Sequence, residues 1–83
     1  MGINYAKLRN LPAREIVSAL TKDGFTLDRQ AGSHRHYLHQ DRRRVTVSFH
    51  QPGDTFRRKT LQAMIELQAR WTEEDLKRLK LVE

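Results

Sequence analysis

The sequence predicts an α+β fold, a two-layer sandwich in which helices cover one face of a three-stranded antiparallel sheet. A helical pattern precedes residue 25, three short strand-like segments lie between residues 25 and 50, and a second helical pattern follows residue 55. No linker divides the 83 residues. We therefore expect a single domain over residues 1–83, with its core at about 11–68 and a C-terminal extension over 70–83.

The first helix is expected between Leu11 and Gly24. Ile16, Val17 and Leu20 recur at the spacing of one helical face. Pro12 suits a first helical turn, and Gly24 suits the left-handed residue that follows a last turn.

Three strands are expected next. The first begins at residues 25–27, and residues 30–33 form the turn that reverses it. The second covers residues 34–39 and the third residues 44–49, with a polar, arginine-rich turn between them. The third strand is the clearest, because apolar and polar residues alternate along it.

The chain should end in two helices. Residues 52–54 end the sheet, and Asp54 or Thr55 is available to cap the helix that follows. One face of that helix is marked by Leu61, Met64, Ile65 and Gln68. The run from Thr72 to Asp75 is typical of a capping box and predicts a short extra C-terminal helix with Leu76 and Leu79.

Strand alternation predicts which histidines face solvent. If Tyr37 faces the core, His34 and His36 face outward, and Arg35 reaches the sheet margin. The opposite choice would bury two imidazoles in a core too small to supply partners. By the same rule, Val45, Val47 and Phe49 face inward, whereas Thr46, Ser48 and His50 face outward.

The positive charge is concentrated in the middle of the chain. Residues 29–59 hold eight basic and two acidic side chains, which equals the whole net charge of +6, and all four histidines. Such a block predicts a surface for a polyanion such as RNA, against the alternative of cations that merely face solvent. The basic residues are Arg29, Arg35, Arg42, Arg43, Arg44, Arg57, Arg58 and Lys59.

Composition narrows the remaining function classes. The sequence has no cysteine, which removes disulfides and thiol chemistry, and no apolar run that approaches a membrane span or signal peptide. We therefore expect a cytoplasmic protein without a membrane segment. A chain this short has no room for a deep cavity, so a ligand should bind on its surface.

Histidines beside cations suit two chemistries. In metal-free RNA cleavage, an imidazole takes the proton of a ribose 2′-hydroxyl while a cation stabilises the charged phosphorus centre. The alternative is a zinc site on His34 and His36, with His50 or His39 as third ligand. Only Asp28 and Asp41 lie near in sequence, and the surrounding cations oppose a dication. We therefore predict no metal and no cofactor, and we interpret His39 as a structural residue.

Residues 11–68 resemble the HicA toxins, small bacterial RNA-cleaving proteins. The most specific part of the resemblance is Arg-Gln-Ala-Gly-Ser-His at 29–34, one short strand after a helix that ends in Gly-Phe. The other matching segments are 14–20, 23–25, Tyr37, 45–47, His50, 52–53 and 60–65. Two features depart from the family's pattern: His36 stands where an apolar residue is common, and the turn at 41–44 is unusually basic.

The resemblance implies an α-β-β-β-α fold like that of double-stranded-RNA-binding domains. It also implies that His34 is catalytic, that the substrate is messenger RNA, and that a HicB-like antitoxin blocks the site. Gly32 and Ser33 then lie at the site, where each either contacts RNA or serves only the tight turn. His36 is left open as an RNA contact, a second proton-transfer group or a neutral surface residue. A non-catalytic double-stranded-RNA-binding module is the alternative, since it needs the cations but no particular histidine. The sequence leaves open whether the chain forms a homo-oligomer or a toxin–antitoxin hetero-oligomer.

Overall fold

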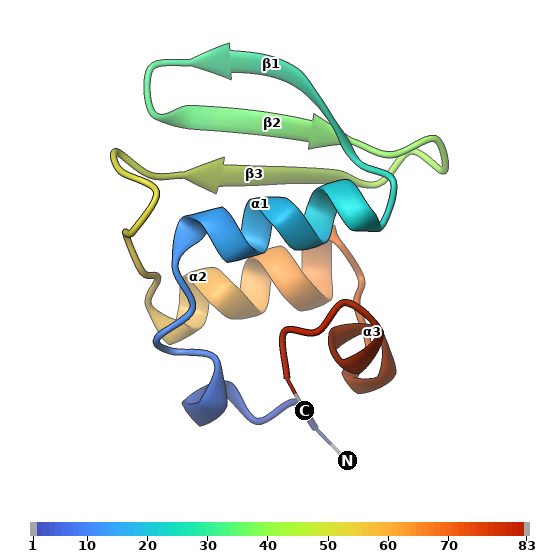
Figure 1. Cartoon of the computed structure of the whole chain (residues 1–83). Coiled ribbons are helices and arrows are strands. Elements are labelled where there is room, and N and C mark those ends of the chain that lie inside the picture. The colour runs from blue at the N-terminus through green and yellow to red at the C-terminus, as the bar shows by residue number, and fades with distance from the viewer. Residues whose placement is uncertain (1, 83) are drawn as a thin grey trace.

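The computed structural model describes residues 2–82 and has the predicted α+β architecture. Figure 1 shows the sheet, with the helices gathered on its β3 side and β1 farthest from them. The elements are η1 (Tyr5–Lys7), α1 (Ala13–Lys22), β1 (Thr26–Ala31), β2 (His34–Leu38), β3 (Arg44–Ser48), α2 (Arg58–Gln62), η2 (Ala63–Gln68) and α3 (Glu73–Arg78). The π-helical turns of η2 continue α2 directly.

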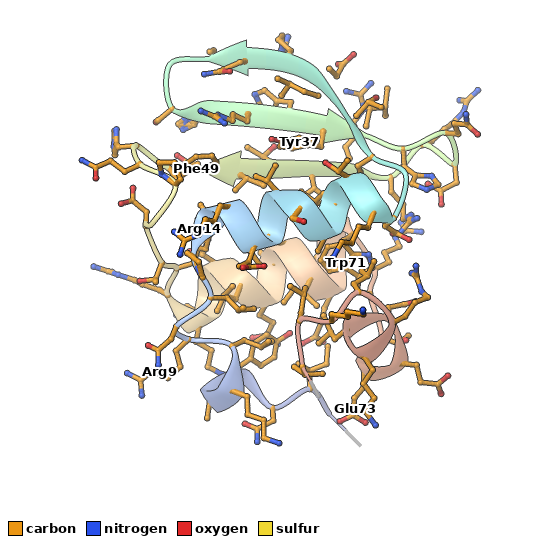
Figure 2. The ribbon with its side chains drawn as sticks, in the orientation of Figure 1. Arg9, Arg14, Tyr37, Phe49, Trp71 and Glu73 are labelled. Atoms are coloured by element: carbon orange, nitrogen blue, oxygen red, sulfur yellow. The ribbon has the colours of Figure 1, made fainter. Side chains whose placement is uncertain are left out.

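The three strands form one antiparallel sheet in the order β1-β2-β3. Tyr37, Val45, Val47 and Phe49 are buried between the sheet and the helices, as the alternation predicts. Figure 2 labels Tyr37 and Phe49 at this layer. The helices contribute Ile16, Leu20, Leu61, Met64 and Ile65 to the same core. The α-β-β-β-α order with an added C-terminal helix is therefore confirmed.

The first helix begins slightly later than predicted. Pro12 has an extended backbone and precedes the helix as its N-terminal flanking residue, rather than lying inside the first turn. Gly24 has a φ of 100°, the left-handed conformation expected after the last turn. A β-carbon at Gly24 would also lie 3.0 Å from the ring of His39. Both the turn and the close approach therefore require glycine.

The turn between β1 and β2 is shorter than predicted. Gln30 and Ala31 belong to β1, and Ala31 pairs with His34, so only Gly32 and Ser33 form the turn. Gly32 has a φ of 59°. Glycine at the first central position is typical of a two-residue hairpin turn whose twist matches that of the strands. The tight turn brings the start of β2 to the edge of the molecule.

The predicted cap of the second helix is wrong. Arg57, not Asp54 or Thr55, is the flanking residue, and its side chain makes no capping hydrogen bond. The Asp54 carboxylate instead accepts hydrogen bonds from the backbone N–H groups of His50 and Gln51, at 2.9 and 3.1 Å. These bonds hold the pKa of Asp54 below its ordinary value. The loop after β3 therefore folds around this carboxylate and does not lead directly into a helix.

The C-terminal extension is anchored to the end of α1. Trp71 is buried, and its Nε1–H donates to the Asp23 carboxylate at 2.8 Å. Arg78 of α3 donates to the same carboxylate at 2.8 Å. The predicted capping box is confirmed, since Thr72 and Asp75 exchange hydrogen bonds at the start of α3. The extension thus completes the core and stabilises the fold.

The two sheet edges are treated differently. On β3, the backbone N–H of Thr46 donates to the side chain of Gln68 at 2.8 Å, so η2 covers this edge. On β1 every residue is exposed, including Leu27, which is 51% accessible although it faces the helix side. None of the helices within residues 2–82 has the length and apolarity needed to cross a bilayer.

Candidate active site

The sheet face opposite the helices carries two of the four histidines. His34 pairs with Ser48 and His36 pairs with Thr46 across β2 and β3, while Arg29 of β1 lies opposite His36 on the other side. Paired residues of an antiparallel sheet point to the same face. This open face, as we call it, is formed by Arg29, Ala31, His34, His36, Arg44, Thr46 and Ser48. The predicted outward direction of His34 and His36 is confirmed.

His34 is the first residue of β2 and is exposed. It directly follows the turn at Gly32 and Ser33, and the backbone N–H of Phe49 donates to the Ser33 carbonyl at 3.1 Å. This bond ties the turn to the end of β3. A β-carbon built on Gly32 would meet nothing within 4 Å, so the turn projects into solvent. The backbone of His34 is thus fixed by the sheet while its ring is open to a large substrate.

His36 is half-buried two residues further along the same strand face. Its Nδ1 lies 3.0 Å from the Thr46 hydroxyl, which fixes the orientation of the ring. Alternate residues of a strand are about 7 Å apart, so His34 and His36 can flank one phosphodiester group. The arrangement offers a second imidazole close to the first.

His39 and His50 lie elsewhere. Both ring nitrogens of His39 are engaged, one 2.8 Å from the Asp23 carbonyl and the other accepting the Asp41 N–H at 3.1 Å, and the ring packs edge-on against Phe25. His39 is therefore structural, as interpreted from the sequence. His50 is exposed in the bend that follows β3.

The zinc alternative on His34 and His36 lacks a third ligand at His39. Engagement of both its nitrogens removes His39 as a third ligand. Over residues 2–82, no three histidine, aspartate or glutamate side chains are grouped as a metal site would require. The open face thus offers two imidazoles rather than a closed ligand set.

The basic residues that were predicted to surround His34 lie in separate parts of the structure. Arg29 shares the open face, next to His36. Arg44 is on that face too, but at the opposite end of β3 from Ser48, about 13 Å along the strand. Arg44 lies 3.9 Å from Asp28, a loose ion pair across the sheet. Arg42 is exposed in the turn at this far end.

Two of the predicted RNA contacts are used inside the fold. Arg35 faces the helix side, where its guanidinium stacks 4.3 Å from the centre of the Phe49 ring. Arg35 shares the face of Tyr37, as alternation requires, and is half-buried, so it does not lie on the open face. Arg43 is only 18% accessible and contacts Asp23, Asp41 and the Ala69 carbonyl.

The Arg43 contacts form an ion-pair cluster with Asp23 at its centre. The side chain of Asp23 is 9% accessible and is paired with both Arg43 and Arg78. Burial alone would raise the pKa of Asp23, but hydrogen bonds from Trp71 and Arg78 and the charge of Arg43 together hold that pKa below its ordinary value. The cluster joins α1, the β2–β3 turn and the C-terminal extension.

The remaining predicted cations, Arg57, Arg58 and Lys59, lie in the helical layer at the start of α2. Arg57 and Arg58 line a hollow of about 790 Å³ together with Arg9 and Asn10. Sequence analysis missed Arg9 and Asn10, because they are nearly 50 residues away in the chain. Only the contact between the N-terminal segment and the loop before α2 brings them to this hollow.

One comparison with known proteins matches more than half of the chain. The family model described as the HicA toxin of bacterial toxin–antitoxin systems matches residues 13–70, from the start of α1 to the end of η2 and two residues beyond. A search of curated proteins finds no match. The matched segment contains the open face with His34, and it excludes Arg9, Trp71 and α3.

Proposed function

The chain belongs to the HicA toxin family of bacterial toxin–antitoxin systems, and from this premise we propose that it is a metal-independent endoribonuclease that cleaves messenger RNA with His34. The observation that carries the proposal is the exposed imidazole at the start of β2, held by the sheet beside a tight turn. Messenger RNA as substrate makes the cytoplasm its place of action.

In the proposed reaction, neutral His34 accepts the proton of a ribose 2′-hydroxyl. The 2′-oxygen attacks the adjacent phosphorus, the bond from phosphorus to the 5′-oxygen breaks, and that oxygen leaves with a proton from an acid or from water. The products are a 2′,3′-cyclic phosphate and a free 5′-hydroxyl. General base catalysis of this kind contributes about 10²- to 10⁴-fold to the rate.

Arg29 is the cation best suited to stabilise the charge that develops on phosphorus. It lies opposite His36 on the neighbouring strand and on the same face, and it makes no ion pair within residues 2–82. Gly32 and Ser33 directly precede His34 at the projecting turn, where a phosphate can approach the backbone closely. His36, oriented by Thr46, is the candidate for the proton that the 5′-oxygen receives.

We also infer that a HicB-like antitoxin inhibits the toxin by covering the open face. Membership of a toxin–antitoxin family supports a protein inhibitor. A face that must admit a long RNA is shallow, and a second protein can occlude it without entering a cavity.

The test compares wild-type protein with His34→Ala on a labelled single-stranded RNA. We expect cleavage to fall by about 10²- to 10⁴-fold while RNA affinity and the circular dichroism spectrum stay unchanged. His50→Ala is the matched control, because His50 is also exposed but lies beyond the end of β3. Substrate with 2′-deoxyribose at the cleaved position should bind and remain intact, and a chelator should have no effect.

Undiminished cleavage by His34→Ala would contradict the assignment of the base. Loss of cleavage on chelation would instead favour the zinc alternative. If the wild-type protein binds double-stranded RNA and cleaves no RNA at all, the chain is a binding module. For the antitoxin, growth arrest on expression should require His34 and should be relieved by co-expression of the reading frame beside the gene.

A further inference from the structure

The hollow in the helical layer differs from the open face in both shape and position. It is lined by the segment around η1 and by the loop that precedes α2, and its volume is about 790 Å³. Pockets of roughly 300–1,000 Å³ hold small ligands or nucleotides. Figure 2 shows Arg9 extending from the N-terminal segment into solvent beside the start of α2. The polar residues that line the hollow are Asn4, Arg9, Asn10, Thr55, Arg57 and Arg58.

The lining of the hollow is rich in donors and cations. Three arginines and no carboxylate line it. None of the three arginines forms an ion pair with a residue in the described part of the chain. Asn4 uses its Oδ1 to accept the Ala6 N–H at 3.1 Å, which leaves its amide N–H groups available. Such a set recognises a phosphate rather than a cation or a neutral group.

The floor of the hollow is apolar and firmly held. Tyr5 and Leu61 are buried there, and Phe56 is half-buried. The Tyr5 hydroxyl donates to Glu66, and the Arg58 guanidinium lies 5.8 Å above the Tyr5 ring. The Glu66 carboxylate that accepts this hydrogen bond is not part of the lining of the hollow. Aromatic groups beside arginines are typical of surfaces that bind single-stranded nucleic acid.

One loop of the chain leads from the proposed active site to the hollow. The chain runs from Ser48, the partner of His34, through the bend at His50 to Arg57. This loop is fastened to the start of α1, because Ala13 and Arg14 donate to the carbonyls of Asp54 and Pro52 at 2.7 and 3.0 Å. Figure 1 shows the loop descending from the end of β3 to the start of α2. Nine residues span at most about 30 Å, a distance that several nucleotides cover.

We propose that this hollow is an accessory RNA-binding site, in which Arg9, Arg57 and Arg58 bind backbone phosphates of the strand that leaves the open face. The inference rests on the proposed ribonuclease function, since it names a second contact for the same substrate. Because the site is remote from the reacting atoms, it raises affinity for long RNA and leaves the chemical step unchanged.

The experiment measures RNA binding in the His34→Ala background, where no cleavage interferes. Arg9→Gln with Arg57→Gln should weaken the affinity for a 20-nucleotide single-stranded RNA at least about tenfold. The slope of log affinity against log salt should also fall by about 1.4, as expected for two lost phosphate contacts. The matched control, Lys22→Gln with Lys77→Gln, removes two exposed cations elsewhere on the surface and should change affinity less than about threefold.

The cleavage-competent protein gives a second readout. With long RNA, the Arg9/Arg57 variant should show a raised KM and an unchanged kcat, whereas a tetranucleotide that occupies only the open face should be cleaved as by wild type. Equal RNA affinity of the Arg9/Arg57 and Lys22/Lys77 variants would overturn the proposal. So would unchanged RNA affinity together with weakened binding of the antitoxin, which would make the hollow a protein-binding site. If the wild-type protein binds RNA and does not cleave it, the ribonuclease function fails, while the binding comparison still decides on the hollow.

Discussion

Replacing Arg43 tests whether this residue is part of the fold, as its contacts indicate, or part of the RNA surface, as its charge suggested. Its Nε donates to Asp41 at 2.7 Å, and its Nη1 donates to the Ala69 carbonyl at 2.6 Å and pairs with Asp23 at 3.1 Å. The guanidinium also lies 4.9 Å from the centre of the Phe25 ring. Arg43→Ala removes all of these contacts at once.

The expected loss of stability follows from these partners. Removing one member of a buried ion pair costs about 3–5 kcal/mol, because the other member is left uncompensated. Here Arg78 still pairs with Asp23, and Asp41 is half-exposed, so the loss should be smaller. The main losses are therefore the hydrogen bond from the charged guanidinium to the buried Ala69 carbonyl, worth about 1.5–3 kcal/mol, and the ion pair with Asp23. The two losses are not fully additive. We expect Arg43→Ala to lower the free energy of unfolding by about 2–4 kcal/mol.

Urea unfolding followed by circular dichroism measures this change as a lower midpoint with an unchanged slope. Arg42→Ala is the matched control. It removes the same charge from the adjacent residue, whose side chain is exposed, and should cost no more than about 0.5 kcal/mol. Equal stability losses in the two variants, or a loss below about 1 kcal/mol for Arg43→Ala, would refute the reasoning.

Two further outcomes test the cluster and the turn. Because the pKa of Asp23 is lower in the folded than in the unfolded state, its stabilisation is present above the ordinary value of 3.8 and is lost as pH falls through the folded value. Urea titrations from pH 5 to 2 should therefore show that the free energy of unfolding depends less on pH in Asp23→Asn than in wild type. The control Asp28→Asn, at an exposed carboxylate, should behave like wild type. Parallel curves for all three proteins would exclude the cluster as a source of acid sensitivity. Gly32→Ala should lower the free energy of unfolding by about 1–2 kcal/mol through the left-handed φ alone, since a β-carbon meets no atom there. Gly53→Ala, at a position without a left-handed φ, should be nearly neutral by the same measurement. Equal effects of the two substitutions would show that the turn does not constrain Gly32.

At the candidate site, strand alternation predicted which side chains face solvent. The inward direction of Tyr37 set the outward direction of His34 and His36, because adjacent side chains of a strand must point to opposite faces. The same rule placed Arg35 on the helix side. Counting charge by segment treated Arg35 as equivalent to Arg29, since a count along the chain carries no information about the face.

Local pattern also failed where two partners competed for one residue. Asp54 has the side chain of a helix cap, yet its carboxylate accepts hydrogen bonds from His50 and Gln51, upstream in the loop. Thr72 meets no such competition, and its capping box formed as predicted. The difference is that Asp54 lies in a loop tied to α1 by its own carbonyl.

The sequence by itself determined the fold class, the element order and the outward His34, because each follows from a periodicity of two or 3.6 residues within a short window. Only the tertiary structure decided what the basic residues do. It placed Arg43 beside Asp23 and Arg9 beside Arg57, across separations of 20 and 48 residues. Ion pairing and burial depend on which distant segments meet in space, so the same residue type holds the fold together in one place and stays free for a ligand in another.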